Sequence, residues 1–417
     1  MGRLDLGVGI VVFPDLLPIL DDLGDLVDCL EVEPQTYWLP TADPGAPWRF
    51  DEDARDELVG RRRPILAHGV SGPVGSAHLP DARTLDHFAA CVKTLGALGA
   101  SEHLSFNQTI IDGQRIEAGL FLPPCPNEAG VARSIDAIRE YQRRLDVPFS
   151  VETGVNYLQP YAGELPDSIF TAHVANGADC GILLDLHNLW CNELNGRERV
   201  VDALDRLPLD RVTEVHLAGG LQRDTHYLDA HSGLTPSALL ELTEVVLPRL
   251  ANVRAVVFEI MPTFLWRVGL DPLVDHLAEL QQLVARARRA NVVGGMRRLS
   301  IGEAPGDGTL AVEPEEWERT LVVAATGWGA AHGEQSSDPA LAIMRHLVDS
   351  GRRGRVTAAT RLTIRLLLVS AGAEVVDRLF DDYCASTPPS LWGHDEGMRF
   401  LDWIEALPHE RLPRLSD

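Results

Sequence analysis

Histidines and a carboxylate lie close together in the stretch from Val212 to His226, which reads VTEVHLAGGLQRDTH. We expect a short buried strand that ends at His216, a turn at the glycine pair that follows, and then Asp224 and His226. Two imidazoles and a carboxylate within eleven residues, next to a strand end, are typical of a metal site. A core histidine followed by a polar loop would read the same way, so the rest of the chain has to decide between these interpretations.

The elements that must position these side chains alternate along the first 290 residues. Longer stretches with a helical spacing of apolar residues separate short runs rich in Val, Ile and Leu. These runs predict eight strands, over Leu6–Val12, Val27–Val32, Pro64–Val70, Ser101–Phe106, Val147–Glu152, Gly181–Leu186, Val212–Leu217 and Ala255–Ile260. Eight strand–helix units over this length predict the α/β class and a (β/α)8 TIM barrel. A doubly wound open sheet, the alternative, would usually carry a glycine fingerprint after its first strand, and the sequence has none there.

A TIM barrel holds its active site at the C-terminal ends of its strands. Six successive predicted strands end in imidazoles or carboxylates, which makes the candidate metal ligands His68, His103, Glu152, Asp185 with His187 and Asn188, His216 with Asp224 and His226, and Glu259. Carboxylates gathered in one place repel one another unless cations separate them. The set is too large for one ion and sufficient for two or three, and its ligand types suit iron, manganese or zinc. Ligand type alone does not separate iron from zinc.

Composition narrows the partners and the compartment. The net charge of −24 argues against nucleic acid as a partner and suits a basic peptide or a metal cation. The six cysteines are scattered and form no C-x-x-C pair, which argues against a disulfide framework and a thiolate zinc site. The sequence shows no signal-peptide pattern and no apolar stretch of about 18 residues. We therefore expect a cytoplasmic protein with no membrane partner.

Six motifs follow one another through the barrel region: HGVSGPVG at His68, SEHLSF at Ser101, VETGVNYL at Val151, LLDLHNLWCN at Leu183, EVHLAGG at Glu214 and DTH at Asp224. Over about residues 5–290 they resemble the multinuclear non-haem iron-dependent oxidative enzymes, a family that includes the methanobactin-type peptide oxidases. The resemblance implies a (β/α)8 barrel with two or three irons of mixed Fe(II)/Fe(III) valence and O2 as co-substrate. The implied substrate is a ribosomally synthesised precursor peptide, modified at a Cys or at another residue.

Carried over residue by residue, the resemblance implies that the ligands named above hold the irons. Two positions depart from the family pattern. Thr153 stands where an asparagine usually follows the glutamate, and the sequence FEIMP has no acidic residue shortly after Glu259. His231, in DAHSG, is an additional imidazole close to the loop. It is a candidate for a substrate contact or a proton carrier, and otherwise a solvated loop residue.

The composition changes after Arg289. Residues 291–312 are rich in glycine and lack periodicity, which predicts a linker between a barrel domain (1–290) and a mainly helical domain (313–417). We expect helices near Pro314–Thr326, Pro339–Asp349, Ala358–Gly372 and Ala373–Cys384, and a last helix capped at His394–Asp395 that places Phe400, Leu401, Trp403 and Ile404 near one face.

The closing stretch, PPSLWGHDEGMRFLDW, resembles the partner proteins that accompany these oxidases as separate chains and help to present the peptide. This resemblance implies a fused oxidase and partner, in which the C-terminal domain replaces a separate partner protein. A small helical bundle that only covers the barrel is the alternative.

Three functions remain open at this point. The first is an iron- and O2-dependent oxidation of a precursor peptide. The second is a metal-dependent hydrolase or isomerase on the same barrel, in which two or three zinc or manganese ions activate water. The third is a metallochaperone or peptide-binding scaffold without catalysis, which the full ligand set disfavours.

Overall fold

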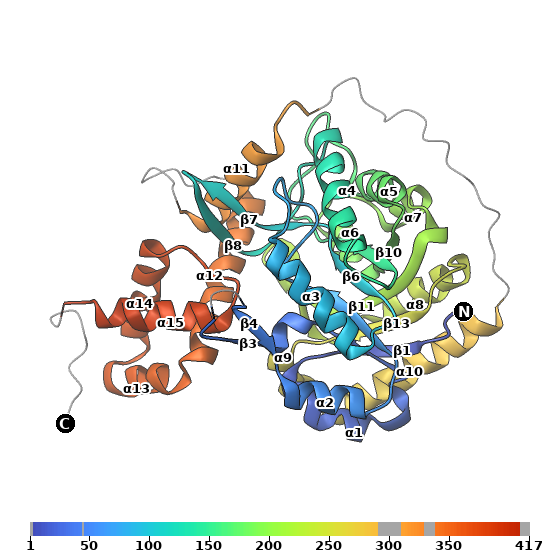
Figure 1. The fold of residues 1–417 in the computed structure, drawn as a ribbon, viewed down its shortest axis with the longest axis horizontal. Helices are drawn as coiled ribbons and strands as arrows, with labels where there is room; N and C mark the ends of the chain where they lie inside the picture. The colour runs from blue at the N-terminus through green and yellow to red at the C-terminus, as the bar shows by residue number, and fades with distance from the viewer. Residues whose placement is uncertain (1–2, 44–45, 291–309, 329–337, 409–417) are drawn as a thin grey trace. The chain divides into compact units, whose positions relative to one another are not determined.

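The computed structural model describes residues 3–43, 46–290, 310–328 and 338–408 (Figure 1). Its contacts divide the chain into two compact units. The barrel unit comprises Met1–Gly75, Leu79–Ser105 and Pro126–Ala311, and the helical unit comprises Ser76–His78, Phe106–Cys125 and Val312–Asp417. The predicted linker falls mostly on residues 291–309, which lie outside the described residues.

Eight parallel strands close into a barrel in their sequence order. The strands are β1 (Gly7–Val12), β2 (Cys29–Val32), β5 (Ile65–Gly69), β6 (Ala100–His103), β9 (Phe149–Glu152), β10 (Gly181–Asp185), β11 (Val212–Arg223) and β13 (Ala255–Glu259). Strand β1 pairs with both β2 and β13, and the β10–β11 pairing completes the ring. The predicted TIM barrel is confirmed.

Helices surround the barrel in the usual alternation (Figure 1). They are α1 (Leu20–Leu23), α2 (Glu52–Gly60), α3 (Ala82–Leu95), α4 (Glu128–Gln142), α5 (Asp167–Ala178), α6 (Leu186–Leu194), α7 (Val200–Arg206), α8 (Ser237–Val246), α9 (Pro262–Val268) and α10 (Leu270–Arg289). In helix α3, local residues determine where the helix begins and ends. The Asp81 carboxylate accepts hydrogen bonds from two first-turn N–H groups, and Gly96 ends the helix at φ 63°. Its buried residues recur every three or four positions and pack on the strands.

Alternation along each strand separates an outer face, which packs beneath the helices, from an inner face. On β13, Val256 and Phe258 join the core beneath the helices, whereas Val257 packs with Val11 in a small apolar cluster. Glu259 follows Val257 by two residues and therefore points to the same inner face. The inner face thus changes from apolar to ionisable toward the C-terminal ends of the strands, where the candidate ligands lie.

Strand β11 runs on past the barrel and forms an antiparallel hairpin with β12 (His226–Gly233). The expectation that the glycine pair turns the chain is wrong, because Gly219 and Gly220 lie within β11. A Cβ on Gly219 would come within 2.4 Å of the Leu234 carbonyl oxygen, and one on Gly220 within 2.4 Å of the Tyr227 ring. These glycines therefore permit a close approach within the hairpin, and the chain turns between the two strands, where Asp224 has φ 48°.

The helical unit contains α11 (Pro314–Thr326), α12 (Pro339–Ala359), α13 (Arg361–Ala371), α14 (Ala373–Ser386) and α15 (Gly393–Glu405), which confirms the helical C-terminal region. It also contains a hairpin that the sequence did not predict, β7 (Phe106–Ile111) with β8 (Gln114–Leu122). Its core includes Phe380, Tyr383 and Phe400. His394 and Asp395 lie inside the first turn of α15 rather than at its cap, which is Trp392.

None of the helices in the described ranges is long and apolar enough to cross a membrane.

Candidate metal centre

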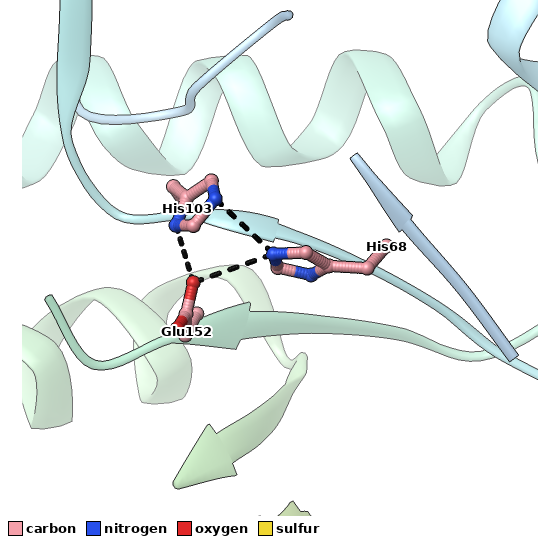
Figure 2. A group of neighbouring side chains, drawn as sticks. All are labelled: His68, His103 and Glu152. Atoms are coloured by element: carbon pink, nitrogen blue, oxygen red, sulfur yellow. Dashed lines mark hydrogen bonds and ion pairs between the residues drawn. The ribbon is translucent and has the colours of Figure 1, made fainter. Parts of the chain in front are cut away.

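Three ligand-type side chains meet at the ends of neighbouring strands β5, β6 and β9 (Figure 2). The Nε2 atoms of His68 and His103 lie 3.1 Å apart, and His68 Nε2 lies 3.5 Å from Glu152 Oε2. The same carboxylate oxygen forms an ion pair with His103 Nδ1. Two imidazoles and a carboxylate that converge from three strands form a ligand group of the type that holds a transition metal.

The neighbours of this group hold its rings in place. The hydroxyl of Ser101, which is paired with His68 in the β5–β6 register, lies 2.8 Å from His68 Nδ1. Burial, together with the charge of His103, lowers the pKa of His68 to about 4. Burial also acts to lower the pKa of His103, but the Glu152 carboxylate outweighs it and raises that pKa to about 9. His68 is therefore neutral at pH 7, as a metal ligand must be, whereas His103 would have to release its proton to bind an ion.

Asp185, at the end of β10, lies opposite His216 of β11 in the strand register. It is fully buried, and its Oδ1 accepts the N–H of Asn188 at 2.8 Å, which caps helix α6. Its Oδ2 accepts no hydrogen bond from the residues that the structure describes. Burial raises the pKa of Asp185 well above its usual range, and the charges of Glu152 and other nearby carboxylates add to this effect. The charge of His216 acts in the opposite direction but does not offset them.

A third group lies where strand β12 folds back toward the barrel end. Asp229 Oδ1 lies 3.1 Å from His187 Nδ1 and 2.8 Å from His231 Nε2, and the latter atom lies 3.1 Å from Glu259 Oε2. His231 has φ 43°, a left-handed conformation that costs a non-glycine residue roughly 1–2 kcal/mol. His231 is thus part of the cluster and no solvated loop residue. Asp185, His231 and Glu259 also form a ligand group.

The structure does not bring Asp224 and His226 to this centre. Asp224 is exposed at the hairpin turn, and His226 packs near the Tyr157 ring with its Nδ1 3.2 Å from the Thr225 hydroxyl. Neither belongs to a ligand group within the described ranges. The physical reason is the hairpin: its turn carries the first Asp-x-His pair away, and β12 returns the second pair, Asp229 and His231.

Sequence reasoning also missed Glu31, which forms a group with His216 and Glu259. The signal was present, because CLEVEP places two carboxylates at the end of the second strand.

Asn188 lies beside the ligands: its Nδ2 lies 3.4 Å from Glu152 Oε1. Thr153, at the position where the family pattern has asparagine, accepts the Asp185 N–H through its hydroxyl at 2.9 Å. It therefore links β9 to β10 beneath the centre.

Fold and site together define a TIM-barrel protein with a histidine–carboxylate centre at its strand ends. The chain belongs to the family described as RiPP precursor modification enzyme MbnB/TglH/ChrH, whose model matches residues 12–287. The family comprises enzymes that modify precursors of ribosomally synthesised, post-translationally modified peptides (RiPPs).

Individual relatives are distant. A UPF0276 protein of Streptomyces avermitilis is 28% identical over 222 residues, which are 52% of this chain and 45% of the relative, so the chain spans less than half of that protein. A UPF0276 protein of Anaeromyxobacter sp. is 28% identical over 267 residues, 63% of this chain and 86% of the relative. Among solved structures, endonuclease IV of Thermus thermophilus shows 16% identity and a TM-score of 0.43 over 67% of this chain and 99% of its own. A D-psicose 3-epimerase of Clostridium cellulolyticum shows 14% identity and a TM-score of 0.41, over 68% and 98%.

Proposed function

We propose that this protein is an iron- and O2-dependent enzyme that oxidatively modifies a ribosomally synthesised precursor peptide. The observation that carries the proposal is the convergence of imidazoles and carboxylates at one end of a barrel whose family modifies such precursors. Of the ions that suit this ligand set, iron and manganese are redox-active, and the resemblance to iron-dependent oxidative enzymes favours iron. Bound iron would supply the activation of O2, which protein side chains do not provide.

The side chains fit metal ions on structural grounds. Buried polar atoms are normally hydrogen-bonded, yet Asp185 Oδ2 and Asn188 Oδ1 are buried without a hydrogen bond from the described residues. The Nε2 atoms of His68 and His103 lie so close together that only one of them can carry a proton in the space between the rings. Within the described ranges, no ligand group contains a cysteine, so the donors are nitrogen and oxygen throughout. Cations would satisfy each of these atoms.

Ligands can be assigned to ions by group. His68, His103 and Glu152 would hold one ion, and Asp185 and His216 with Glu152 a second. A further group consists of His231, Glu259 and Asp185, and Asp229 joins His231 to His187. Glu152, Asp185 and Glu259 each belong to two groups, which makes these three the candidates for bridging carboxylates. The arrangement accommodates two or three ions.

Several side chains of the chain hold the ligands of the centre in position. Ser101 holds Nδ1 of His68 and so leaves Nε2 for the ion. Asp229 forms a ligand group with His187 and His231, and its contacts with both rings also set their orientation. The backbone N–H of Asp229 in turn donates to the Tyr157 hydroxyl at 3.0 Å, which anchors the hairpin strand that carries these residues.

We also propose that the helical unit takes the place of a separate partner protein and binds the precursor peptide. Its support is the resemblance of the closing stretch to such partners and the unit's own core around Tyr383 and Phe400. The test compares peptide affinity of the full chain with that of a chain ended near residue 305. Retained metal content in the shortened chain would show that the barrel has folded, and unchanged peptide affinity would then contradict the proposal.

The test of the oxidase function starts with the metal. Protein purified without oxygen from cells grown on ⁵⁷Fe should hold two or three irons per chain, coupled in its Mössbauer spectrum. Addition of O2 and the peptide encoded beside the gene should consume O2 and change the peptide mass. Full occupancy by zinc or manganese, with iron neither present nor taken up, would instead favour hydrolase or isomerase chemistry.

A further inference from the structure

Carboxylates flank His216 at both of its ring nitrogens. Its Nε2 lies 3.0 Å from Oε1 and 3.1 Å from Oε2 of Glu31. Its Nδ1 lies 2.9 Å from Glu259 Oε1, and His216 also forms a ligand group with Glu152 and Asp185. Neither His216 nor Glu31 is exposed to solvent. The two sides of the ring therefore meet different surroundings.

On the Nε2 side, the ring faces two buried carboxylates, those of Glu31 and Glu214. Glu31 reaches His216 from β2, which is not paired with β11, and the two residues are 185 positions apart. Glu214 precedes His216 by two residues on the same strand, so both point inward, and Glu214 Oε1 lies 3.8 Å from Nε2. A carboxylate buried in this way is costly unless a donor satisfies it, and the ring N–H of His216 is such a donor.

The Nδ1 side differs in that its nitrogen has no hydrogen-bond partner among the described residues. Nδ1 is buried, and Glu259 lies close to it. His68 shows the same division in mirror form: Ser101 holds its Nδ1, and its Nε2 faces His103 and Glu152. In both histidines one nitrogen is held by a neighbour in the barrel, and the other faces the remaining ligands.

We propose that Glu31 is a positioning residue of the metal centre, which accepts the Nε2–H of His216 and so presents Nδ1 to the ion. A metal-bound histidine commonly donates its second ring N–H to a carboxylate, and this bond fixes the tautomer and the ring orientation. The inference rests on the metal centre proposed above and goes beyond it, because it names the coordinating atom of His216 and gives Glu31 a role. Glu31 itself as a ligand is the competing arrangement, since it forms a group with His216 and Glu259.

The experiment uses the full chain and two substitutions. Glu31→Gln keeps an oxygen that can accept the Nε2–H, whereas Glu31→Leu removes it. Glu318→Gln and Glu318→Leu are matched controls, because Glu318 is a buried carboxylate of the helical unit, where its Oε1 accepts the Ala77 N–H. Iron(II) affinity and stoichiometry are measured without oxygen. The ring nitrogens are observed by NMR in zinc-loaded protein labelled with ¹⁵N-histidine, and the His216 signals are those lost in His216→Gln.

The expected result has three parts. In the wild type, His216 shows a protonated Nε2 and a metal-bound Nδ1. Glu31→Gln keeps this pattern and full stoichiometry, with an iron(II) affinity reduced roughly 10-fold, and Glu31→Leu loses the slowly exchanging Nε2–H with a reduction nearer 100-fold. The Glu318 variants change neither the His216 signals nor the affinity. If Glu31→Leu does not fold, Glu31→Gln and the wild-type spectrum still decide the question.

Three outcomes would overturn the inference. A metal-bound Nε2 in the wild type would assign the opposite nitrogen. Loss of one ion per chain in Glu31→Gln would make Glu31 a ligand, and unchanged affinity and spectrum in Glu31→Leu would leave it without a role. A wild type that binds neither iron(II) nor zinc(II) would refute the metal centre itself, a failure that is distinct from the other three.

Discussion

Asp185→Asn should stabilise the metal-free protein and at the same time weaken its response to metal. Asp185 is fully buried, and only one of its two oxygens is hydrogen-bonded to a described residue, the Asn188 N–H. Asparagine caps a helix about as well as aspartate, so the substitution keeps the N-cap of α6. What it removes is a carboxylate without a counter-charge.

The magnitude follows from the cost of a buried, unsatisfied polar group, which is about 1–3 kcal/mol and higher when the group is charged. Burial raises the folded-state pKa of Asp185 above its unfolded value, so the folded chain binds a proton that the unfolded chain releases. This contribution is fully present below the unfolded pKa, near 3.9, and is lost as pH rises toward the folded pKa. We therefore expect Asp185→Asn to add about 1–3 kcal/mol to the free energy of unfolding at pH 7.5 and almost nothing at pH 4.

With metal bound, the wild type should be more stable to unfolding than Asp185→Asn, the reverse of the order expected without metal. Iron(II) at about 100 times its dissociation constant would add about 2.7 kcal/mol to the wild type for each ion bound, and the variant should gain less because it loses the ligand groups that contain Asp185. Urea denaturation of both proteins, with and without iron(II) under anaerobic conditions, measures each difference. Asp167→Asn is the matched control: Asp167 is paired with Arg197 at 2.6 Å, so that substitution should destabilise the protein in both states. A metal-free Asp185→Asn protein that is less stable than the wild type at pH 7.5 would refute the reasoning.

Three further predictions concern the hairpin and the helical unit. His231→Ala should remove about one iron per chain and His226→Ala none, as elemental analysis of reconstituted protein will show; equal loss in both would contradict the assignment. Gly220→Ala should cost about 1–3 kcal/mol in urea denaturation, because its Cβ would lie 2.4 Å from the Tyr227 ring; unchanged stability would exclude this close contact. Burial raises the pKa of Glu318 to about 7, so stability is lost as pH rises through that value. Glu318→Gln should therefore gain about 3 kcal/mol at pH 8.5 and little at pH 5, and an equal gain at both would show that ionisation is not the cause.

Most of the barrel could be predicted because its signal is local and repeated. Most of the parallel strands, such as Gly181–Asp185, lie in short apolar runs, and the helices between strands have their own apolar spacing. The hairpin Phe106–Leu122 was not predicted. Its first strand begins at Phe106, where the predicted strand Ser101–Phe106 ends, so no separate strand was expected there. The alternation of FNQTII and QRIEAGLFL is irregular, and Gly119 has φ 76°.

In the candidate site, too, the residues at the ends of barrel strands could be predicted and those on the hairpin could not. His68, His103, Glu152, Asp185, His216 and Glu259 belong to strand ends, and the barrel brings strand ends together whatever the loops do. Asp229 and His231 could not be separated from Asp224 and His226, because the sequence contains two Asp-x-His pairs five residues apart and both lie beyond the strand. Only the register of β11 with β12, in which Arg223 faces His226, decides which pair returns to the barrel.

The shared carboxylates connect the energetics of the fold to its chemistry. Glu152 serves the group of His68 and also that of His216, and Asp185 serves the groups of His216 and His231. An ion bound at one group therefore neutralises charge that a neighbouring ion also needs, and a single vacancy leaves a bridging oxygen buried without a partner. Such a centre is costly for the metal-free fold and stable once filled, so metal binding and folding stability must change together. The barrel can carry this cost because its apolar layer beneath the helices is separate from the inner face that holds the ligands.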